Sequence, residues 1–465
     1  MATEQQQGPR YELDVHRFFT QSRQTKVERH ALGEAQRAIV PLEQLAAVPT
    51  KKNRANALSI LHGQDTTREQ WLVPLRYERM GMSAFTFLRG AAGVMASDLS
   101  KTPNSGISVQ LCGDAHLNNF GLFASHDRSL VFDINDFDET LPGPFDWDVK
   151  RLAASVAVAA LDSGASKKKA RSAAQAAATA YRNTMSILMD ISTMDVWNLR
   201  VDTDVLAMVE TGKSLREATA RATRKSMLST SETATAKLTT MVDGKRRFRS
   251  DPPILIPLRD EDRESATEVV ELAYAGYLKS LPADRVALLG QYSLIDLAHK
   301  VVGVGSVGTR AYVLLLEDGD GNPLVLQVKE AAASVLEKYV GNSYFANHGQ
   351  RVVVGQQVLQ TTGDPLLGWV GGAEFRYDFY VRQLKDLKGA IDVARLTYKG
   401  LFDYARVCGV TLARAHARVG DPAMVSGYLG DDDTFDLAIA DFSMEYARIN
   451  ASDYAQMKHQ TPSPA

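Results

Sequence analysis

The chain has 465 residues, a formal net charge of −2, 45% hydrophobic residues and 23% charged residues. This length and composition are typical of a soluble globular protein of two or three domains, and the small net charge argues against a general nucleic-acid or membrane-surface binder. The two cysteines, Cys112 and Cys408, lie far apart and form no CxxC pair, which excludes a disulfide scaffold and a cysteine-built zinc site.

The beginning of the chain, "MATEQQQGPRYELDVHRFF", is polar and lacks the apolar stretch of a signal peptide. The most apolar helix-like run, "LAASVAVAALDSGA" from Leu152, is too short to span a bilayer. We therefore expect a cytoplasmic protein with no membrane partner.

The first half of the chain alternates helical and strand-like patterns. Residues 1–60 are polar and are predicted to form an N-terminal extension, and a helix is predicted to end near Ser100. The strand-like "ISVQLCGD" begins at Ile107, and a second strand, "SLVFDINDFDE" (129–139), ends in acidic residues, so we expect a hairpin with a short connection. Segment 146–190 is predicted to be helical, with a break near "DSGAS".

Segment 213–249 is strongly basic, with ten Lys or Arg residues and three acidic residues. One interpretation is a solvated helix face followed by a loop. The other is an anion-binding surface near a phosphate-bearing substrate, and the sequence does not decide between them.

From Tyr292 the pattern becomes β-rich, with three strand-like stretches and the hairpin turn "DGDGN" between two of them. A helix is predicted around 346–361, followed by a strand from Phe379 to Leu384. The remaining chain is predicted to be helical, with an amphipathic helix in "LFDYARVCGVTLARAHARVGD".

The glycine-rich "GVGSVG" (Gly303–Gly308) is weak evidence by itself. A Rossmann site requires a helix directly after the glycines, whereas "TRAYVLLLE" reads as a strand. Strand, glycine loop and strand is instead the protein-kinase arrangement for covering ATP phosphates, and Lys329, which ends the next strand, is expected to bind the α- and β-phosphates. The candidate phosphate-binding residues of the loop are Gly303, Gly305, Ser306 and Gly308.

The stretches "CGDAHLNN" and "NDFD" resemble the catalytic loop and metal-binding strand of aminoglycoside-phosphotransferase-like and other kinase-like enzymes. The resemblance implies that Asp114 is the catalytic aspartate and that Asn119 and Asp136 bind Mg²⁺. The chemistry requires these residue types, because Mg²⁺ prefers hard oxygen ligands and a separate carboxylate must accept the proton of the attacking hydroxyl. This sequence departs from the pattern at Cys112, where a histidine is usual, and in the additional acids Asp138 and Glu139.

The resemblance also implies supporting roles for residues outside the two motifs. His116 is expected to support the loop, and Asp148, in "PFDWDVKRLA", to be its structural aspartate. Asp138 is a candidate for a second metal ligand, although a solvated turn acid is the more common alternative. Glu337 is the nearest candidate for a carboxylate partner of Lys329.

Two further groups remain open. Gln383 and Leu384, in the hinge-like "YVRQLKDLKG", are expected to contact the nucleotide. The arginines of "LRYERM" and "FLRG" (Arg76, Arg79, Arg89) either bind a substrate phosphate or carboxylate, or pair with the acids of "DFDE", and pairing is the more common role.

The motifs occur in the reverse of the usual order, because Asp114 precedes Gly303 by nearly two hundred residues. We interpret this as a circular permutation, which is physically accessible because chain ends often lie close together at the surface. The expected fold is α+β, a permuted protein-kinase-like fold of two lobes. Its parts are an extension (1–60), a helical catalytic lobe (61–290), a small antiparallel-sheet nucleotide lobe (291–388) and C-terminal helices that pack back on the catalytic lobe (389–465).

Most of the chain also resembles the bacterial family called domain of unknown function twenty-two fifty-two. The stretches that carry this resemblance include "FTFLRGAAGVMASDL", "QLCGDAHLNNFG", "FDINDFDETLPGPFDWDVKRLA" and "KVVGVGSVGTRAY". The family implies a kinase-like fold but no specific activity.

The leading functional hypothesis is an ATP- and Mg²⁺-dependent phosphotransferase that acts on a hydroxyl of a small molecule or a protein. Alternatives are nucleotidyl transfer with ATP bound in the opposite direction, a nucleotide-binding pseudokinase, and a partner-binding protein without catalysis. A dinuclear metallophosphoesterase is a weaker alternative, because "GDAH" offers an Asp-x-His pair but His299, His348 and His416 lie in no ligand-like motif.

Overall fold

The computed structural model describes residues 11, 15–125, 127, 129–201, 213–227, 231–258, 260–301, 303–370, 375–384 and 389–460, with only the backbone at 17, 231, 234 and 260–267. The predictions for the first ten residues, for 228–230 of the basic segment and for 385–388 of the hinge-like stretch lie outside the described residues.

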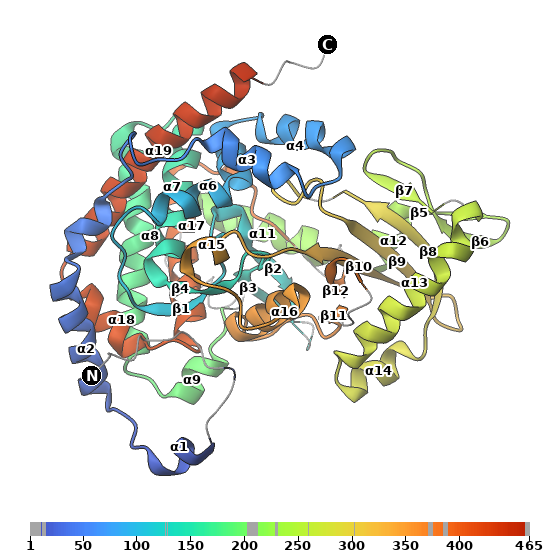
Figure 1. Ribbon diagram of the computed structural model, residues 1–465, viewed down its shortest axis with the longest axis horizontal. Coiled ribbons are helices and arrows are strands. Elements are labelled where there is room, and N and C mark those ends of the chain that lie inside the picture. Colours follow the sequence, from blue (N-terminus) through green and yellow to red (C-terminus); the bar gives the residue numbers. More distant parts are fainter. Residues whose placement is uncertain are drawn as a thin grey trace.

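The protein has an α+β fold in which a large helical part lies beside one larger antiparallel sheet (Figure 1). The described helices that precede Ser293 are α1 (Val15–Thr20), α2 (Lys26–Ile39), η1 (Leu42–Ala46), α3 (Ala57–Asp65), η2 (Gln70–Leu72), α4 (Val73–Met80), α5 (Ala84–Gly90), α6 (Ala92–Leu99), η3 (Leu117–Asn119), α7 (Phe145–Asp162), α8 (Lys167–Leu188), α9 (Thr193–Asn198), α11 (Lys213–Met227), α12 (Ser231–Leu238), α13 (Asp260–Lys279) and α14 (Ala283–Leu289). The later helices are α15 (Glu337–Val340), α16 (His348–Leu359), η4 (Val393–Arg395), α17 (Tyr398–Ala417), α18 (Pro422–Leu429) and α19 (Thr434–Gln460). In the described part of the chain, no helix is both long enough and apolar enough to cross a bilayer.

The larger sheet has the strand order β11-β12-β10-β9-β8-β7, and every neighbouring pair is antiparallel. Its strands are β7 (Leu255–Pro257), β8 (Ser293–Lys300), β9 (Ala311–Glu317), β10 (Pro323–Ala331), β11 (Gly368–Val370) and β12 (Asp378–Gln383). The predicted turn "DGDGN" joins β9 to β10, and the predicted helix after β10 is α16. These predictions are confirmed.

The described residues of the motif region form two two-stranded ribbons rather than the single predicted hairpin. Its strands are β1 (Ser108–Leu111), β2 (Phe120–Ala124), β3 (Leu130–Ile134) and β4 (Leu141–Pro144), and a separate ribbon joins β5 (Thr239–Val242) to β6 (Lys245–Phe248). The predicted pairing of β1 with β3 is wrong, because β1 pairs with β4 while β3 pairs with β2.

The helical core joins both ends of the chain. Helix α17 packs against α8, and α19 packs against α7 and α8. Helix α2, in the expected N-terminal extension, lies against α18, and η1 lies against α19. The predicted break near "DSGAS" is confirmed, because α7 ends at Asp162 and α8 begins at Lys167.

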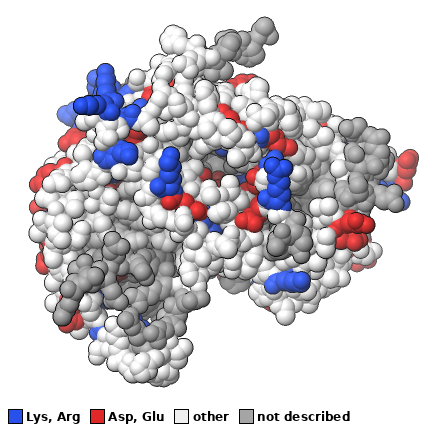
Figure 2. Space-filling model, in the orientation of Figure 1, with Lys and Arg blue, Asp and Glu red and all other residues white. Residues whose placement is uncertain are grey.

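Helices α3 and α4 lie at the top of the view in Figure 1, and the α3–α4 region contacts the loop between the end of β8 and the start of β9. On the face shown in Figure 2, basic and acidic side chains alternate in small groups.

Candidate active site

A cavity of about 240 Å³ lies between the helical core and the sheet. It is lined by side chains and backbone from four separate segments of the chain. These are the α3–α6 region (Gln64, Thr67, Arg68, Arg89, Gly90, Ala92), the motif loop (Asp114, His116, Asn119), the acidic stretch (Asp136, Asp138, Glu139) and the glycine loop with the end of β10 (Gly303, Val304, Gly305, Ser306, Thr309, Glu330, Ala331, Ala332, Ala333, Val335). The residues predicted from two distant motifs thus share one cavity.

Asp148 fixes the backbone at the start of the motif loop. Its carboxylate accepts hydrogen bonds from the backbone N–H groups of Cys112 (2.8 Å) and Gly113 (3.1 Å). The Nε2 of His416, on α17, lies 3.2 Å from the same carboxylate, and the Nδ1 of His416 lies 2.9 Å from the Tyr181 hydroxyl. All of these side chains are buried, so α7, α8 and α17 together determine the position of the residue that follows, Asp114.

Gly113 also lets the acidic stretch approach the motif loop. Its φ is +85°, and a Cβ atom there would lie 2.2 Å from the carbonyl oxygen of Glu139. Only glycine fits both the conformation and the contact.

Asp114 is paired with Arg151, whose Nε and Nη2 lie 2.8 and 2.7 Å from its Oδ1. Burial raises the pKa of Asp114 to about 6, although Arg151 acts in the opposite direction. The side-chain amide of Asn119 donates to the backbone carbonyl of Asp114 (2.8 Å), which leaves the Asn119 Oδ1 for a ligand in the cavity. A carboxylate with this pKa can accept a proton near neutral pH.

The buried side chain of Lys329, on β10, forms an ion pair with the partly exposed Asp138 at 2.7 Å. The Tyr380 hydroxyl, on the neighbouring strand β12, donates to the other oxygen of Asp138 at 2.7 Å. Burial acts to lower the pKa of Lys329, but Asp138 outweighs it and the net shift is upward. Lys329 is therefore a permanent cation beside the cavity.

The prediction that Glu337 is the partner of Lys329 is wrong. The Glu337 carboxylate lies near His348 (3.6 Å) and Arg351 (3.8 Å) and accepts a hydrogen bond from the Ser334 N–H. Glu337 belongs to the short helix α15, which precedes α16, and α16 presents Arg351 toward the acidic stretch. The carboxylate for Lys329 consequently comes from the motif region and not from the helix after β10.

The glycine loop between β8 and β9 is anchored to the α3–α4 region. Arg68 donates to the carbonyl of Val307 (2.5 Å), Arg79 donates to the carbonyl of Gly303 (2.6 Å), and the Glu69 N–H donates to the carbonyl of Gly308 (2.8 Å). Gly303 and Gly308 both have positive φ values, which glycine adopts without strain.

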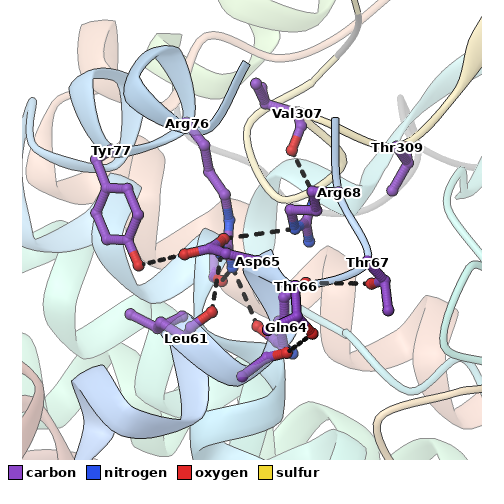
Figure 3. A network of polar contacts seen from close by, with 12 residues as sticks. Leu61, Gln64, Asp65, Thr66, Thr67, Arg68, Arg76, Tyr77, Val307 and Thr309 are labelled. Carbon is purple, nitrogen blue, oxygen red and sulfur yellow. Dashed lines mark hydrogen bonds and ion pairs between the residues drawn. The ribbon is translucent and has the colours of Figure 1, made fainter. Parts of the chain in front are cut away.

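Arg76 lies behind these contacts, where it binds Asp65 next to Arg68 (Figure 3). Its guanidinium is buried and pairs with Asp65, which also accepts a 2.7 Å hydrogen bond from the Tyr77 hydroxyl. The alternative in which these arginines pair with the acids of "DFDE" therefore does not apply to Arg76 and Arg79. Arg76 pairs with Asp65 of α3, and Arg79 donates to the carbonyl of Gly303 in the glycine loop.

Gln383 and Leu384 do not line the cavity. Gln383 borders a separate hollow of about 30 Å³, and Leu384 is buried in an apolar cluster with Leu238, Phe248 and Val325. Their prediction as nucleotide contacts is not met by this geometry, because α12 and β6 of the basic segment cover the sheet face on which Leu384 lies.

In the part of the chain that the structure describes, no group of three or more His, Cys, Asp or Glu side chains is arranged to hold a metal ion. Asn119 and Asp136 both face the cavity, and they supply one amide oxygen and one carboxylate. This donor set fits Mg²⁺, which keeps several waters and takes only one or two carboxylates together with substrate phosphates. Asp138, expected as a further ligand, is instead held by Lys329 and Tyr380.

A family model described as "Uncharacterized protein conserved in bacteria (DUF2252)" matches residues 68–460. The chain belongs to this family. The match includes the motif loop, the acidic stretch, the glycine loop and α17, so the whole cavity except Gln64 and Thr67 is formed by the family's own domain. Neither the curated proteins nor the solved structures that were compared contain a match.

Several residues of the site carried no recognisable signal in the sequence. Arg151 lies three residues after Asp148 on α7, so the two face the same side of that helix, but only the fold shows that Asp114 lies there. Tyr380 reaches Asp138 because β12 places it directly opposite Lys329 in the antiparallel register. Arg68 lies just outside the stretches that were singled out.

Glu139 gives the site a pH-dependent stability. Burial raises its pKa to about 7, while the hydrogen bond from the Val335 N–H (2.7 Å) acts in the opposite direction. Since the folded-state pKa lies above the unfolded value of about 4.3, the folded protein keeps the proton longer, and stability falls as the pH rises from about 4.5 to 7.

We expect Glu139→Gln to remove this loss, because an amide oxygen still accepts from Val335 and cannot ionise. The free energy of unfolding, measured with urea, should be compared for the variant and the wild type at pH 5 and at pH 8. The difference in favour of the variant should be about 2 kcal/mol larger at pH 8 than at pH 5. The exposed Glu43→Gln is the matched control and should follow the wild-type profile. Parallel pH profiles for Glu139→Gln and the wild type would contradict the assignment.

Proposed function

We propose that the protein is an ATP- and Mg²⁺-dependent phosphotransferase with a circularly permuted kinase-like fold, acting on a hydroxyl of an acceptor not yet identified. The observation that carries the proposal is the shared cavity. Asp114 and Asp138 precede Gly303 by more than 160 residues in the sequence, yet all three line one cavity, and Lys329 contacts that cavity's Asp138.

The order of the elements supports this proposal. The glycine loop joins the first two strands of a hairpin, the lysine ends the third strand, and a helix and a hinge-like strand follow, as in kinases. Helix α17, which resembles the helix that leads into the catalytic loop of kinase-like enzymes, lies near the C-terminus and contributes His416 beneath that loop.

The chemistry follows from the named groups. The glycine loop and Lys329 would hold the phosphates of ATP, and Asn119 and Asp136 would hold Mg²⁺, which neutralises charge on the phosphate oxygens. Asp114 would accept the proton of the acceptor hydroxyl as its oxygen bonds to the γ-phosphorus. The bond between that phosphorus and the bridging oxygen then breaks, and ADP leaves with the electron pair.

A second candidate is nucleotidyl transfer, with ATP bound in the opposite direction. It is favoured by one observation, namely that Leu238, Phe248 and Leu384 close the sheet face where a base would otherwise stack beside the hinge-like strand. The two reactions differ in their products, because phosphoryl transfer releases ADP and nucleotidyl transfer releases pyrophosphate.

The first test is thermal unfolding of the full chain with and without Mg·ATP. A ligand at about 100 times its Kd should add about 2.7 kcal/mol to the stability of the wild type. Lys329→Ala and Asp136→Ala should lose this gain, and the exposed Lys26→Ala should keep it. If Mg·ATP stabilises none of the four proteins, the proposed function is wrong.

A further inference from the structure

The cations around the cavity are nearly all engaged with protein groups. Lys329 pairs with Asp138, and Arg151 pairs with Asp114. Arg351 donates to the carbonyls of Thr140, Asp138 and Ala332. Each of these cations therefore already has a protein partner.

Arg89 differs from them. It lies near the end of α5 and lines the cavity, yet its guanidinium has no hydrogen-bond or ion-pair partner among the described residues. Burial lowers the pKa of Arg89, while Asp114 and Asp136 act in the opposite direction, so the side chain lies within electrostatic range of both acids. A partly buried guanidinium without a partner lowers the stability of the folded protein unless an anion binds to it.

Arg151 is already engaged with Asp114, and the described residues of the motif loop offer no second positive charge. His116 is the nearest basic side chain on the motif loop, but burial lowers its pKa well below the usual value, so it is neutral. The positive charge available to a ligand next to the catalytic carboxylate therefore comes from α5.

The surroundings of Arg89 suit an oxyanion. A Cβ atom on Gly305 would lie 3.4 Å from the backbone carbonyl oxygen of Arg89, so the tip of the glycine loop rests on the end of α5. Ala92, which also lines the cavity, begins α6, and no side chain caps that helix. The glycine loop and the start of α6 thus border the same cavity as Arg89.

We propose that Arg89 is a catalytic residue that binds the transferred phosphoryl group, in an oxyanion subsite separate from the α- and β-phosphate site at Lys329. This inference rests on the proposed function. The planar guanidinium donates two parallel hydrogen bonds to two non-bridging oxygens of one phosphate. It stays protonated throughout, while the proton of the acceptor hydroxyl goes to Asp114 and the electron pair of the broken bond goes to ADP.

The test is calorimetric binding of three probes with Mg²⁺ present, namely the non-hydrolysable β,γ-imido analogue of ATP, ADP and inorganic phosphate. Arg89→Ala should bind the analogue roughly 10- to 100-fold more weakly while the Kd for ADP changes less than about threefold, as expected for loss of one charge-assisted bidentate contact. Arg89→Lys should recover part of the loss. Lys329→Ala should weaken binding of ADP and the analogue alike.

The controls separate this subsite from a structural role. Arg171→Ala removes an exposed arginine paired with Asp441 and should leave all three affinities unchanged. Equal losses for ADP and the analogue in Arg89→Ala, or no loss for either, would overturn the inference while nucleotide binding by the wild type stands. If the wild type binds neither nucleotide, the proposed function is wrong. Binding of inorganic phosphate then tests whether the oxyanion subsite exists. Phosphate binding that Arg89→Ala abolishes supports the subsite, and no phosphate binding by the wild type overturns it.

Discussion

Asp114→Asn is expected to lower the rate of γ-phosphate transfer from ATP by roughly 10²- to 10⁴-fold, the usual contribution of a positioned general base. The amide keeps the size of the side chain and a hydrogen-bond acceptor for Arg151, which lies 2.8 Å from the carboxylate, so the motif loop should keep its place. The substitution thus removes the proton acceptor, and Lys329 and Asn119 should keep their positions.

Phosphate release from ATP, with water as acceptor, measures this effect before the physiological acceptor is known. Stabilisation by Mg·ADP should persist in the variant, because the phosphate-binding groups remain. The exposed Asp441→Asn is the matched control. A variant with the wild-type rate would show that Asp114 is not the base.

The pH profile gives an independent readout of the same residue. Because burial raises the pKa of Asp114 to about 6, the rate in the wild type should rise as the pH increases through 6 and then level off. The base must be deprotonated to accept a proton, so the rate should increase and not decrease with pH. Asp114→Asn should lack this rise.

Arg414→Met is expected to destabilise the protein by about 3–5 kcal/mol, the usual result of removing one partner from a buried ion pair. Arg414, on α17, pairs with Asp133 of β3 and donates to the carbonyl of Leu359 at 2.8 Å and to the Thr361 hydroxyl at 3.0 Å. Both charged side chains are almost completely buried. The substitution removes the ion-pair partner of a buried carboxylate between α17 and β3.

Urea unfolding of a double-mutant cycle tests this explanation. Burial already raises the pKa of Asp133 against the effect of Arg414, so the stranded carboxyl should take up a proton and the loss should shrink at low pH. Arg414→Met combined with Asp133→Leu should recover most of the stability. Removing the exposed Arg171–Asp441 pair should cost no more than about 1 kcal/mol. A loss below 1 kcal/mol for Arg414→Met alone would contradict the role of the pair.

The local elements were predictable where short-range rules decide them. The turn "DGDGN" joins two strands because its residues favour the turn conformation, and α7 and α8 separate at "DSGAS" because glycine and serine interrupt an Ala-rich helical pattern. The motif loop was recognisable because carboxylates and amides follow an apolar strand. Pairing between strands was less accessible, and β1 was assigned to β3 although β4 is its partner.

Partners across the site were missed for a related reason. Glu337 was selected for Lys329 because it is close in the sequence, whereas the structure uses Asp138, 191 residues away. Gln383 and Leu384 were selected from a hinge-like pattern, but the basic segment packs over that region of the sheet. Sequence distance carries no information about which buried charges meet.

By itself, the sequence determined the element types, the two chemical motifs and membership of the bacterial family, because each depends on residues that are close together in the chain. The tertiary structure alone decided that the motifs share a cavity, that Asp138 neutralises Lys329, and that Arg89 has no hydrogen-bond or ion-pair partner among the described residues. These contacts arise when apolar faces of distant segments are buried together, and the burial then requires each enclosed charge to find a counter-charge or a ligand.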